Sequence, residues 1–242
     1  MFKRDEIKFV SLHNGLTEIE EALPRRAKEF VPEWFTHMPI KDKATDVGTI
    51  KRCPGLFDYF DQGYIIPAWC DMKFVYDKES DFWSCTLGSS DDFNVDIHTN
   101  QQFLNHVPAA NVNGVKATFV FKLISPWFII TKPGWSVMQL PLYYHFNNEF
   151  SILPGVIDTD IYHQTNQQLV YFGDNKEIII KRGEPLVQYI PFKREKTSLV
   201  IEERNDSNFR IIKKANDWIN GKFENTSAYR QMQKSRDKDM LK

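Results

Sequence analysis

The chain has 242 residues, and its 14% aromatic content, with 19 Phe, suits packed β-sheets. It carries 31 Lys or Arg against 32 Asp or Glu, a formal net charge of −1, which gives no global field for nucleic acid or an anionic membrane. No apolar run approaches the roughly 20 residues that span a bilayer, so we expect a soluble globular protein with no membrane segment and no strong nucleic-acid signal.

The N-terminus and the cysteines indicate a protein that is not secreted. Residues Met1–Glu6 are mostly charged and lack the apolar core of a secretion signal. Cys53, Cys70 and Cys85 are widely spaced and fit neither a disulfide framework nor a CxxC metal knuckle. We expect reduced, mostly buried thiols.

Residues 1–50 are predicted to form an N-terminal cap with short helices. A strand is expected within 7–12, and helix-like spacing follows at 17–21 and 24–37. Pro32 lies inside the second stretch and breaks the helical hydrogen-bond ladder unless it occupies a first turn. The sequence therefore predicts two short helices there rather than one long helix.

Residues 51–204 are predicted to form a β domain, because short β-like runs alternate with turn signals such as Pro133-Gly134 and Pro154-Gly155. The runs are 73–76, 81–86, 94–98, 118–124, 127–131, 136–140, 157–162, 168–172, 178–181, 186–192 and 199–203. Many short strands at this spacing are typical of a barrel, a jelly roll or a related β architecture.

Residues 205–242 are predicted to form a charged C-terminal helix and tail. A helix is expected near 209–219, with Ile212, Trp218 and Ile219 on one apolar face. The tail beyond it is rich in Lys and Arg, and we expect either a solvated segment or one that a partner orders.

The stretch from Leu153 to Gln188 carries the most specific motifs of the chain. Leu153–Tyr162 reads Leu-Pro-Gly-Val-Ile-Asp-Thr-Asp-Ile-Tyr, and about twenty residues later Ile178–Gln188 reads as a strand, a glycine turn and a second strand ending in Gln. In order and spacing these motifs resemble the third and following motifs of the trimeric dUTPases and the related dCTP deaminases. The resemblance implies a mainly β, dUTPase-like β-clip or distorted jelly roll, assembled as a homo-oligomer, with a trimer favoured.

The same resemblance implies site residues. Asp158 would orient and deprotonate the attacking water, and Gln188 would contact phosphate, with Mg²⁺ as the cofactor of such a hydrolase. The ligand-binding residues would be Gly155, Ile157, Asp160 and Tyr162.

The chain also departs from the dUTPase pattern. After Ser136-Val137-Met138 the sequence reads Gln139–His145, with neither the Arg nor the Ser that would neutralise a triphosphate. Tyr162 stands one position late, and a one-residue slip on a strand turns a side chain to the opposite face. The stretch Gln164–Gln168 has no Glu where a deaminase would carry one. An alternative interpretation of Asp158 is structural, as a cap on the amides of the turn that follows it.

The whole chain also resembles a family of proteins found in tailed phages, particularly those of cyanobacteria. The shared features are Lys51-Arg52-Cys53-Pro54, Gly63–Pro67 and Gln188–Arg194. This resemblance implies a viral origin, a location in the cytoplasm of the infected host or in the virion, and a phage or host partner bound through the basic C-terminal tail. It transfers no catalytic residue, and the cofactor is left open.

A metal site is the weakest of the alternatives. Asp96 and His98 alternate on one face of a predicted strand and, together with His163, are the ligand types of a two-His, one-carboxylate iron centre. Histidines at such positions more often make structural hydrogen bonds.

Three functions are thus consistent with the residues. The leading hypothesis is a non-catalytic phage protein with a structural or interaction role on a dUTPase-like β scaffold. The first alternative is an altered deoxynucleotide triphosphate hydrolase or nucleotide-binding protein, and the second is a cupin-like non-haem iron oxygenase.

Overall fold

The computed structural model describes residues 6–77, 79–80, 82–88, 93–99, 101–106, 111–112, 115–116, 119–172 and 177–220. The chain divides into two compact units, the first containing residues 1–32 and 62–194 and the second 33–61 and 195–242. The basic tail predicted beyond residue 220 lies outside the described residues.

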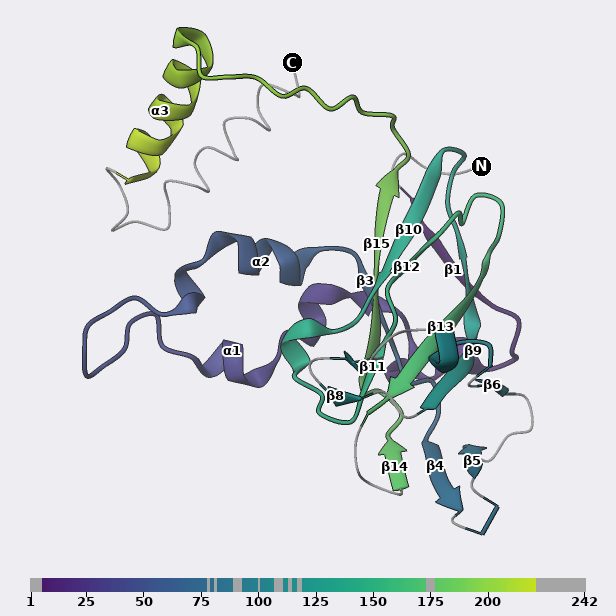
Figure 1. Ribbon diagram of the computed structural model, residues 1–242. Coiled ribbons are helices and arrows are strands. Elements are labelled where there is room, and N and C mark those ends of the chain that lie inside the picture. Colours follow the sequence, from purple (N-terminus) through teal and green to yellow (C-terminus); the bar gives the residue numbers. More distant parts are fainter. Residues whose placement is uncertain are drawn as a thin grey trace. The chain divides into compact units, whose positions relative to one another are not determined.

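The first unit is built from antiparallel sheets (Figure 1). The first sheet has the order β1 (Lys8–Ser11), β9 (Phe119–Ile130), β13 (Gln164–Tyr171) and β11 (Phe150–Ile152), with β6 (Val95–His98) also paired to β9. The second has the order β12 (Gly155–Ile157), β10 (Trp135–Leu140), β15 (Pro185–Lys193), β3 (Tyr64–Pro67) and β2 (Arg25–Arg26). The third has the order β14 (Glu177–Ile180), β4 (Met72–Asp77) and β5 (Phe82–Leu87), and β7 (Asn111–Val112) pairs with β8 (Val115–Lys116). The mainly β prediction is confirmed, and the described strands form no closed barrel.

Strand β9 joins two runs that the sequence predicted to be separate strands. It continues through Pro126, where the amide of Trp127 donates to Ser125 Oγ at 3.1 Å. Its two halves pair with β6 and β1 along one edge, while β13 runs along the other edge with a register shift between Gln164 and Asn166. Proline has no backbone N–H to donate to a regular ladder, so within a strand it is tolerated at an irregularity of this kind.

Two other strand predictions are wrong at their positions. The run at 157–162 is a strand only as far as Ile157, since the amides of Ile161 and Tyr162 both donate to the carbonyl of Asp158 at 2.9 Å and close a turn. The run at 199–203 has no regular secondary structure, and its Leu199–Ile201 segment is exposed. Asp158, Asp160 and Tyr162 therefore lie outside the strand, and the alternation of side chains along a strand does not predict where they point.

Aromatic side chains of the first and third sheets pack together in the core. Trp83 of β5 stacks edge to face on Phe121 of β9 and Tyr171 of β13, with ring centroids 5.7 and 4.9 Å apart. Phe74 of β4 packs on Phe121 at 4.4 Å. Such edge-to-face pairs stabilise the core beyond the area they bury, which explains the high aromatic content of the sequence.

A buried polar network links the first two sheets. Tyr189 of β15 donates to Gln139 of β10 at 2.7 Å and accepts from Gln167 of β13 at 2.8 Å. Gln139 in turn donates to the carbonyl of Leu153 at 2.9 Å. Burial raises the pKa of Tyr189, so its hydroxyl stays protonated.

Replacing Tyr189 by phenylalanine is expected to lower the free energy of unfolding by about 1–3 kcal/mol, because two buried amide groups lose their partner. Urea unfolding of the wild type and of Tyr189→Phe measures this loss. The exposed Tyr162→Phe is the matched control, and an equal effect of both substitutions would contradict the role of the network.

Short 3-10 turns replace the predicted helices at the N-terminus of the first unit. They are η1 (Leu16–Glu18), η2 (Glu20–Ala22) and η3 (Ala27–Phe30). The expected interruption at Pro32 is confirmed, because η3 ends before it and α1 (Glu33–His37) begins directly after it. Two further turns of this kind, η5 (Leu104–His106) and η6 (Tyr143–His145), connect strands of the first unit.

The second unit contains the longer helices. Its first part comprises α1, the 3-10 turn η4 (Ile50–Arg52) and α2 (Pro54–Asp61), in which Phe35 packs on Phe57 and Phe60 with centroids 5.2 and 4.8 Å apart. Its second part contains the predicted C-terminal helix, observed as α3 (Asp206–Asn220). Trp218 and Ile219 of the predicted apolar face lie outside the described side chains. No helix in the described part of the chain has the length and apolar character needed to cross a membrane.

The cysteines are all free. Cys70 is buried and Cys85 is half-buried, but Cys53 is exposed, so the expectation of mostly buried thiols holds for two of the three.

Candidate functional site

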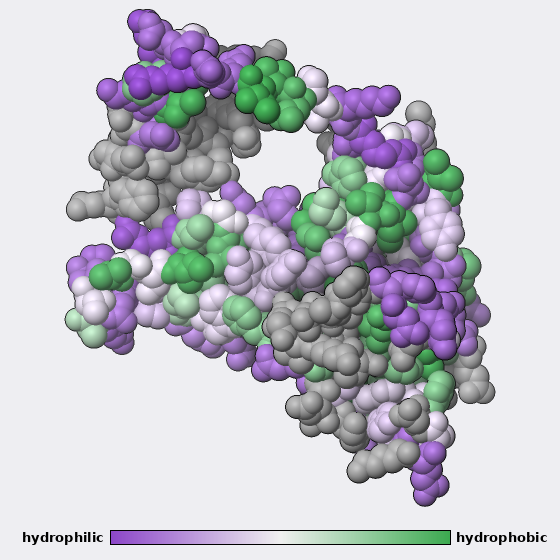
Figure 2. Space-filling model, in the orientation of Figure 1, coloured by the Kyte–Doolittle hydropathy of each residue, from purple (hydrophilic) through white to green (hydrophobic). Residues whose placement is uncertain are grey.

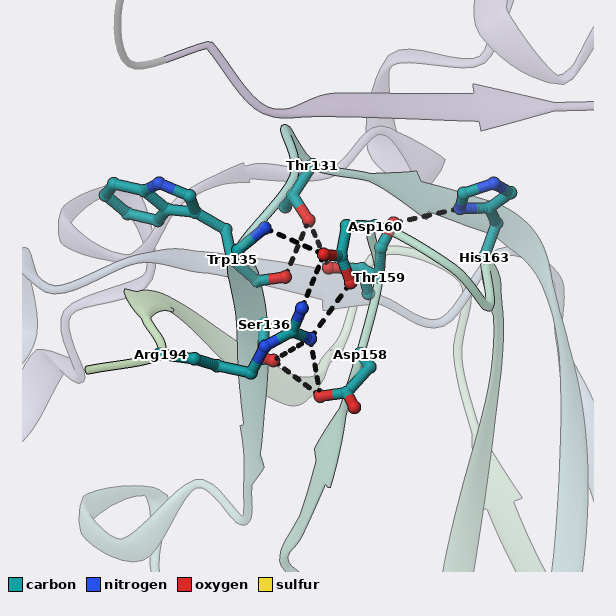
Figure 3. Close-up of polar contacts among 9 residues, drawn as sticks. Thr131, Trp135, Ser136, Asp158, Thr159, Asp160, His163 and Arg194 are labelled. Carbon is teal, nitrogen blue, oxygen red and sulfur yellow. Dashed lines mark hydrogen bonds and ion pairs between the residues drawn. The ribbon is translucent and has the colours of Figure 1, made fainter. Parts of the chain in front are cut away.

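Two carboxylates, a hydroxyl and a guanidinium meet at one end of the second sheet (Figure 3). Ser136 lies near the start of β10, Asp158 directly follows β12, and Arg194 directly follows β15. Antiparallel pairing sets Ser136 opposite Phe192 and Val137 opposite Ile157, which brings these three strand ends together. Asp160 joins them from the turn after β12.

Arg194 is the centre of this cluster. Its Nη1 lies 2.9 Å from Asp158 Oδ1, 2.9 Å from Asp160 Oδ1 and 3.0 Å from Ser136 Oγ, and its Nη2 donates to Asp160 Oδ2. Ser136 Oγ also donates to Asp158 Oδ1 at 2.6 Å, and the amide of Gly134 donates to Asp160 Oδ2 at 2.8 Å. The Asp160 side chain is 6% exposed and that of Asp158 is 54% exposed. Asp160 is thus the enclosed partner of Arg194.

The backbone around the cluster is held by turns. Gly134 has φ 82°, a left-handed conformation that favours glycine, and its carbonyl accepts from the amide of Arg194 at 2.8 Å. Thr131 and Thr159 share a hydroxyl hydrogen bond of 2.8 Å, and His163 Nδ1 lies 2.9 Å from the carbonyl of Thr159. These contacts fix the turn that carries Asp160 against the end of β9.

Electrostatics keeps all three ionisable groups of the cluster charged. The hydrogen bond from Ser136, followed by that from Arg194, lowers the pKa of Asp158. The hydrogen bonds from Arg194 and then Gly134 lower the pKa of Asp160, and both carboxylates raise the pKa of Arg194. A carboxylate with a lowered pKa accepts a proton less readily than an ordinary one, so this arrangement does not favour general-base chemistry at Asp158.

The lowered pKa values predict how stability depends on pH. Because both carboxyl groups bind protons more weakly in the folded state, their contribution is fully present above the ordinary aspartate pKa of about 3.9 and is lost as the pH falls through the lowered folded-state values. We expect a melting temperature that declines below about pH 4. Asp158→Asn should show a shallower decline in a thermal melt series. An unchanged decline in this variant would exclude Asp158 as a contributor.

An open groove of about 450 Å³ borders the cluster. Its described lining consists of Val156, Ile157, Asp158, Tyr162, Gln164, Asn166 and Gln168. The side chains of Gln164, Asn166 and Gln168 lie on one face of β13, because they are every second residue of the strand. The buried Oδ1 of Asn166 has no hydrogen-bond partner among the described residues. The groove is therefore polar, with one carboxylate and no cationic side chain in its described lining.

The structure brings together only part of the predicted nucleotide site. Ile157, Asp158 and Tyr162 line the groove, whereas Asp160 is not in its described lining and pairs with Arg194. Gly155 lies on the edge strand β12, outside the groove's described lining.

The side chain of Gln188 makes its hydrogen bond away from these residues. It is 2% exposed on β15 and donates from Nε2 to the carbonyl of Gln62 at 2.7 Å. It is not among the described residues of the groove lining.

The candidate metal ligands make ordinary polar contacts. Asp96 accepts from the amide of Ile97 and lies 3.8 Å from Lys122, and His98 pairs through its backbone with Val120. No group of three or more His, Cys, Asp or Glu side chains suited to a metal occurs among the described residues. Iron binding by Asp96, His98 and His163 stays a prediction.

Sequence reasoning missed the partners of Asp158. The prediction that its side chain caps the following turn is wrong, since that side chain accepts from Ser136 and Arg194 instead. Arg194 ends the Gln188–Arg194 motif, one residue beyond the strand that pairs with Ser136's strand. Predicting that β10 pairs with β15 would have placed Arg194 near Ser136.

Comparison with known proteins finds similarity in solved structures alone, since no family model and no curated protein matches the chain. A mutant dUTPase of phage 80alpha aligns with 84% of this chain and 99% of its own, at 9% identity and a TM-score of 0.37. The dUTPase of Staphylococcus aureus phage phi11 aligns over 84% and 99%, at 10% identity and a TM-score of 0.36. The Staphylococcus phage 80alpha dUTPase with dUPNHPP aligns over 84% and 91%, with the same identity and score as the phi11 enzyme. These proteins are dUTPases, the family that residues 153–188 resemble, and at such scores the likeness assigns no activity and no residue role to this chain.

Proposed function

We propose that this chain is a non-catalytic protein with a structural or interaction role on a dUTPase-like β scaffold. The proposal is supported chiefly by the contacts that the Asp158 carboxylate already makes within the protein. The carboxylate that would activate water is paired with Arg194 and Ser136, and both contacts favour its charged, weakly basic form.

The charge of the groove supports the same proposal. A nucleoside triphosphate needs positively charged groups or several hydrogen-bond donors around its phosphates. Arg194 already pairs with two carboxylates, which leaves the cluster of Asp158, Asp160 and Arg194 with a net charge of −1. Gln188, the expected phosphate contact, donates to the Gln62 carbonyl.

The segment after β15 offers an interaction element. Leu199, Val200 and Ile201 are consecutive, β-prone and exposed, and Figure 2 shows apolar surface on the extended segment that precedes α3. Exposed apolar runs of this kind mark interaction sites. We propose that this segment mediates self-association, with a trimer expected. Docking to a phage or host protein, in the virion or the infected cytoplasm, we propose for the basic C-terminal tail.

Nucleotide binding provides the main test of the proposal. A thermal-shift series with dUTP, dCTP and their monophosphates at millimolar concentration, with and without Mg²⁺, is expected to give no stabilisation. A ligand at 100 times its Kd would stabilise by about 2.7 kcal/mol, so binding of useful affinity would be visible. Stabilisation that Asp158→Asn abolishes would instead favour the altered hydrolase or nucleotide-binding alternative.

Self-association is tested separately. Light scattering of the full chain is expected to show an oligomer that the combined Leu199→Ser, Val200→Ser and Ile201→Ser variant dissociates. A matched control carries Val156→Ser and Ile161→Ser, which are also exposed. An oligomer that resists the triple variant would remove this segment from the interface.

A further inference from the structure

A second cavity of about 660 Å³ lies in the first unit, away from the Arg194 cluster. Its floor includes Ile152 of β11 and Leu186 of β15, both buried. Tyr143 and Phe146 also line it, and they are 60% and 62% exposed. The volume falls within the range of small-molecule sites, and the wall is a mixture of apolar and aromatic groups with a few polar ones, as in such sites.

The conformation of Phe146 is an independent indication of function. Its φ of 50° and ψ of 45° place it in the left-handed region, where a side chain with a Cβ is strained and glycine or asparagine is preferred. The ring is 62% exposed at the cavity, and it packs edge to face on Tyr144 with ring centroids 6.3 Å apart. Backbone strain of this kind clusters at ligand-binding positions, where the surrounding structure holds the residue in place.

The charge of the lining selects among ligands. Among the described lining residues, Glu184 is the single carboxylate and no Lys or Arg is present. Burial lowers the pKa of His145, which favours the neutral ring. Asn147 uses its Oδ1 to accept from the amides of Glu149 and Phe150, which fixes the loop at the rim. A ligand therefore meets two accessible aromatic rings and one negative charge.

We propose that this cavity binds a small planar aromatic amine, whose ring packs on Tyr143 and Phe146 and whose positive charge is balanced by Glu184. Ring stacking and cation–π attraction supply the affinity, and the carboxylate excludes anionic ligands of the same shape. The site shares no lining residue with the groove beside Asp158, so it stands independently of the proposed function.

Two probes of equal ring and opposite charge test the proposal. In ¹⁵N-resolved NMR titrations of the full chain, tryptamine is expected to bind at least roughly tenfold more tightly than indole-3-acetate, which corresponds to about 1.4 kcal/mol. The shifted amides should include those of residues 143–147. Glu184→Gln is expected to bring the two affinities together. No tryptamine binding at millimolar concentration, or equal affinity for both probes, would overturn the proposal.

The role of the aromatic rings has its own readout. Tyr143→Ala is expected to weaken tryptamine binding roughly fivefold. Tyr162→Ala, which changes a comparably exposed tyrosine in the other groove, is expected to leave it unchanged. Phe146→Gly should weaken binding while preserving or raising the melting temperature, because glycine relieves the left-handed strain. If Phe146→Gly destabilised the fold and left binding unchanged, the ring would be structural and the proposed site would fail.

Discussion

Replacing Arg194 by methionine is expected to lower the melting temperature by several degrees, because it leaves the enclosed carboxylate of Asp160 without its cation. The guanidinium makes contacts to Asp158, Asp160 and Ser136, so one substitution removes the centre of the cluster. Breaking an enclosed pair from one side costs more than the pair itself contributes, since the remaining charge is left uncompensated. Thermal unfolding followed by circular dichroism measures the change.

A set of matched variants separates the ion pair from general effects of charge. Lys196→Met removes an exposed positive charge two residues further along and should change the melting temperature little. Adding Asp160→Asn to Arg194→Met should recover part of the loss, because the orphaned charge is then gone. Equal effects of Arg194→Met and Lys196→Met would contradict the structural role of the cluster.

Replacing Gly63 by alanine is expected to lower the free energy of unfolding by about 4 kcal/mol or more, which is an exceptional cost for a single methyl group. Gly63 has φ 69°, and a Cβ at this position would lie 2.1 Å from the carbonyl oxygen of Tyr189. That atom belongs to the backbone of β15, within the second sheet, so it cannot move aside without disturbing the strand pairing. Urea or guanidinium unfolding measures the loss.

Gly15 provides the control for this substitution. It has a similar φ of 77°, but a Cβ there would meet no atom within 4 Å. Gly15→Ala should therefore show the backbone cost alone, about 1–2 kcal/mol. If the two alanine variants lost the same stability, the close approach of β15 to Gly63 would not be the cause.

Local sequence patterns were sufficient to predict part of the fold. Alternating and aromatic runs located most strands of the three sheets, because a strand with one buried face needs that period to pack. Pro32 was sufficient to divide the N-terminal helical stretch, since a proline ring is incompatible with a helix interior. Where short helices were expected at 17–21, the chain forms tighter 3-10 turns, which the same spacing of apolar residues also permits.

Other elements depended on partners distant in the chain. The stretch after Ile157 reads like a strand, but it turns back on the carbonyl of Asp158. The segment 199–203 has strong β propensity and yet pairs with no strand in the described part of the chain. A strand needs a neighbour to satisfy its backbone groups, and propensity alone does not supply one.

Residue patterns were enough to identify a mainly β protein whose motifs around Asp158 and Gln188 resemble those of dUTPases. The contacts that these residues make depend on the tertiary structure. Antiparallel pairing of β10 with both β12 and β15 brings Arg194 to Asp158 and Asp160, across 36 and 34 positions in the sequence. Strand register depends on long-range packing, and it sets which ends of strands meet. The charge state and accessibility of Asp158, and with them the proposed function, follow from that meeting.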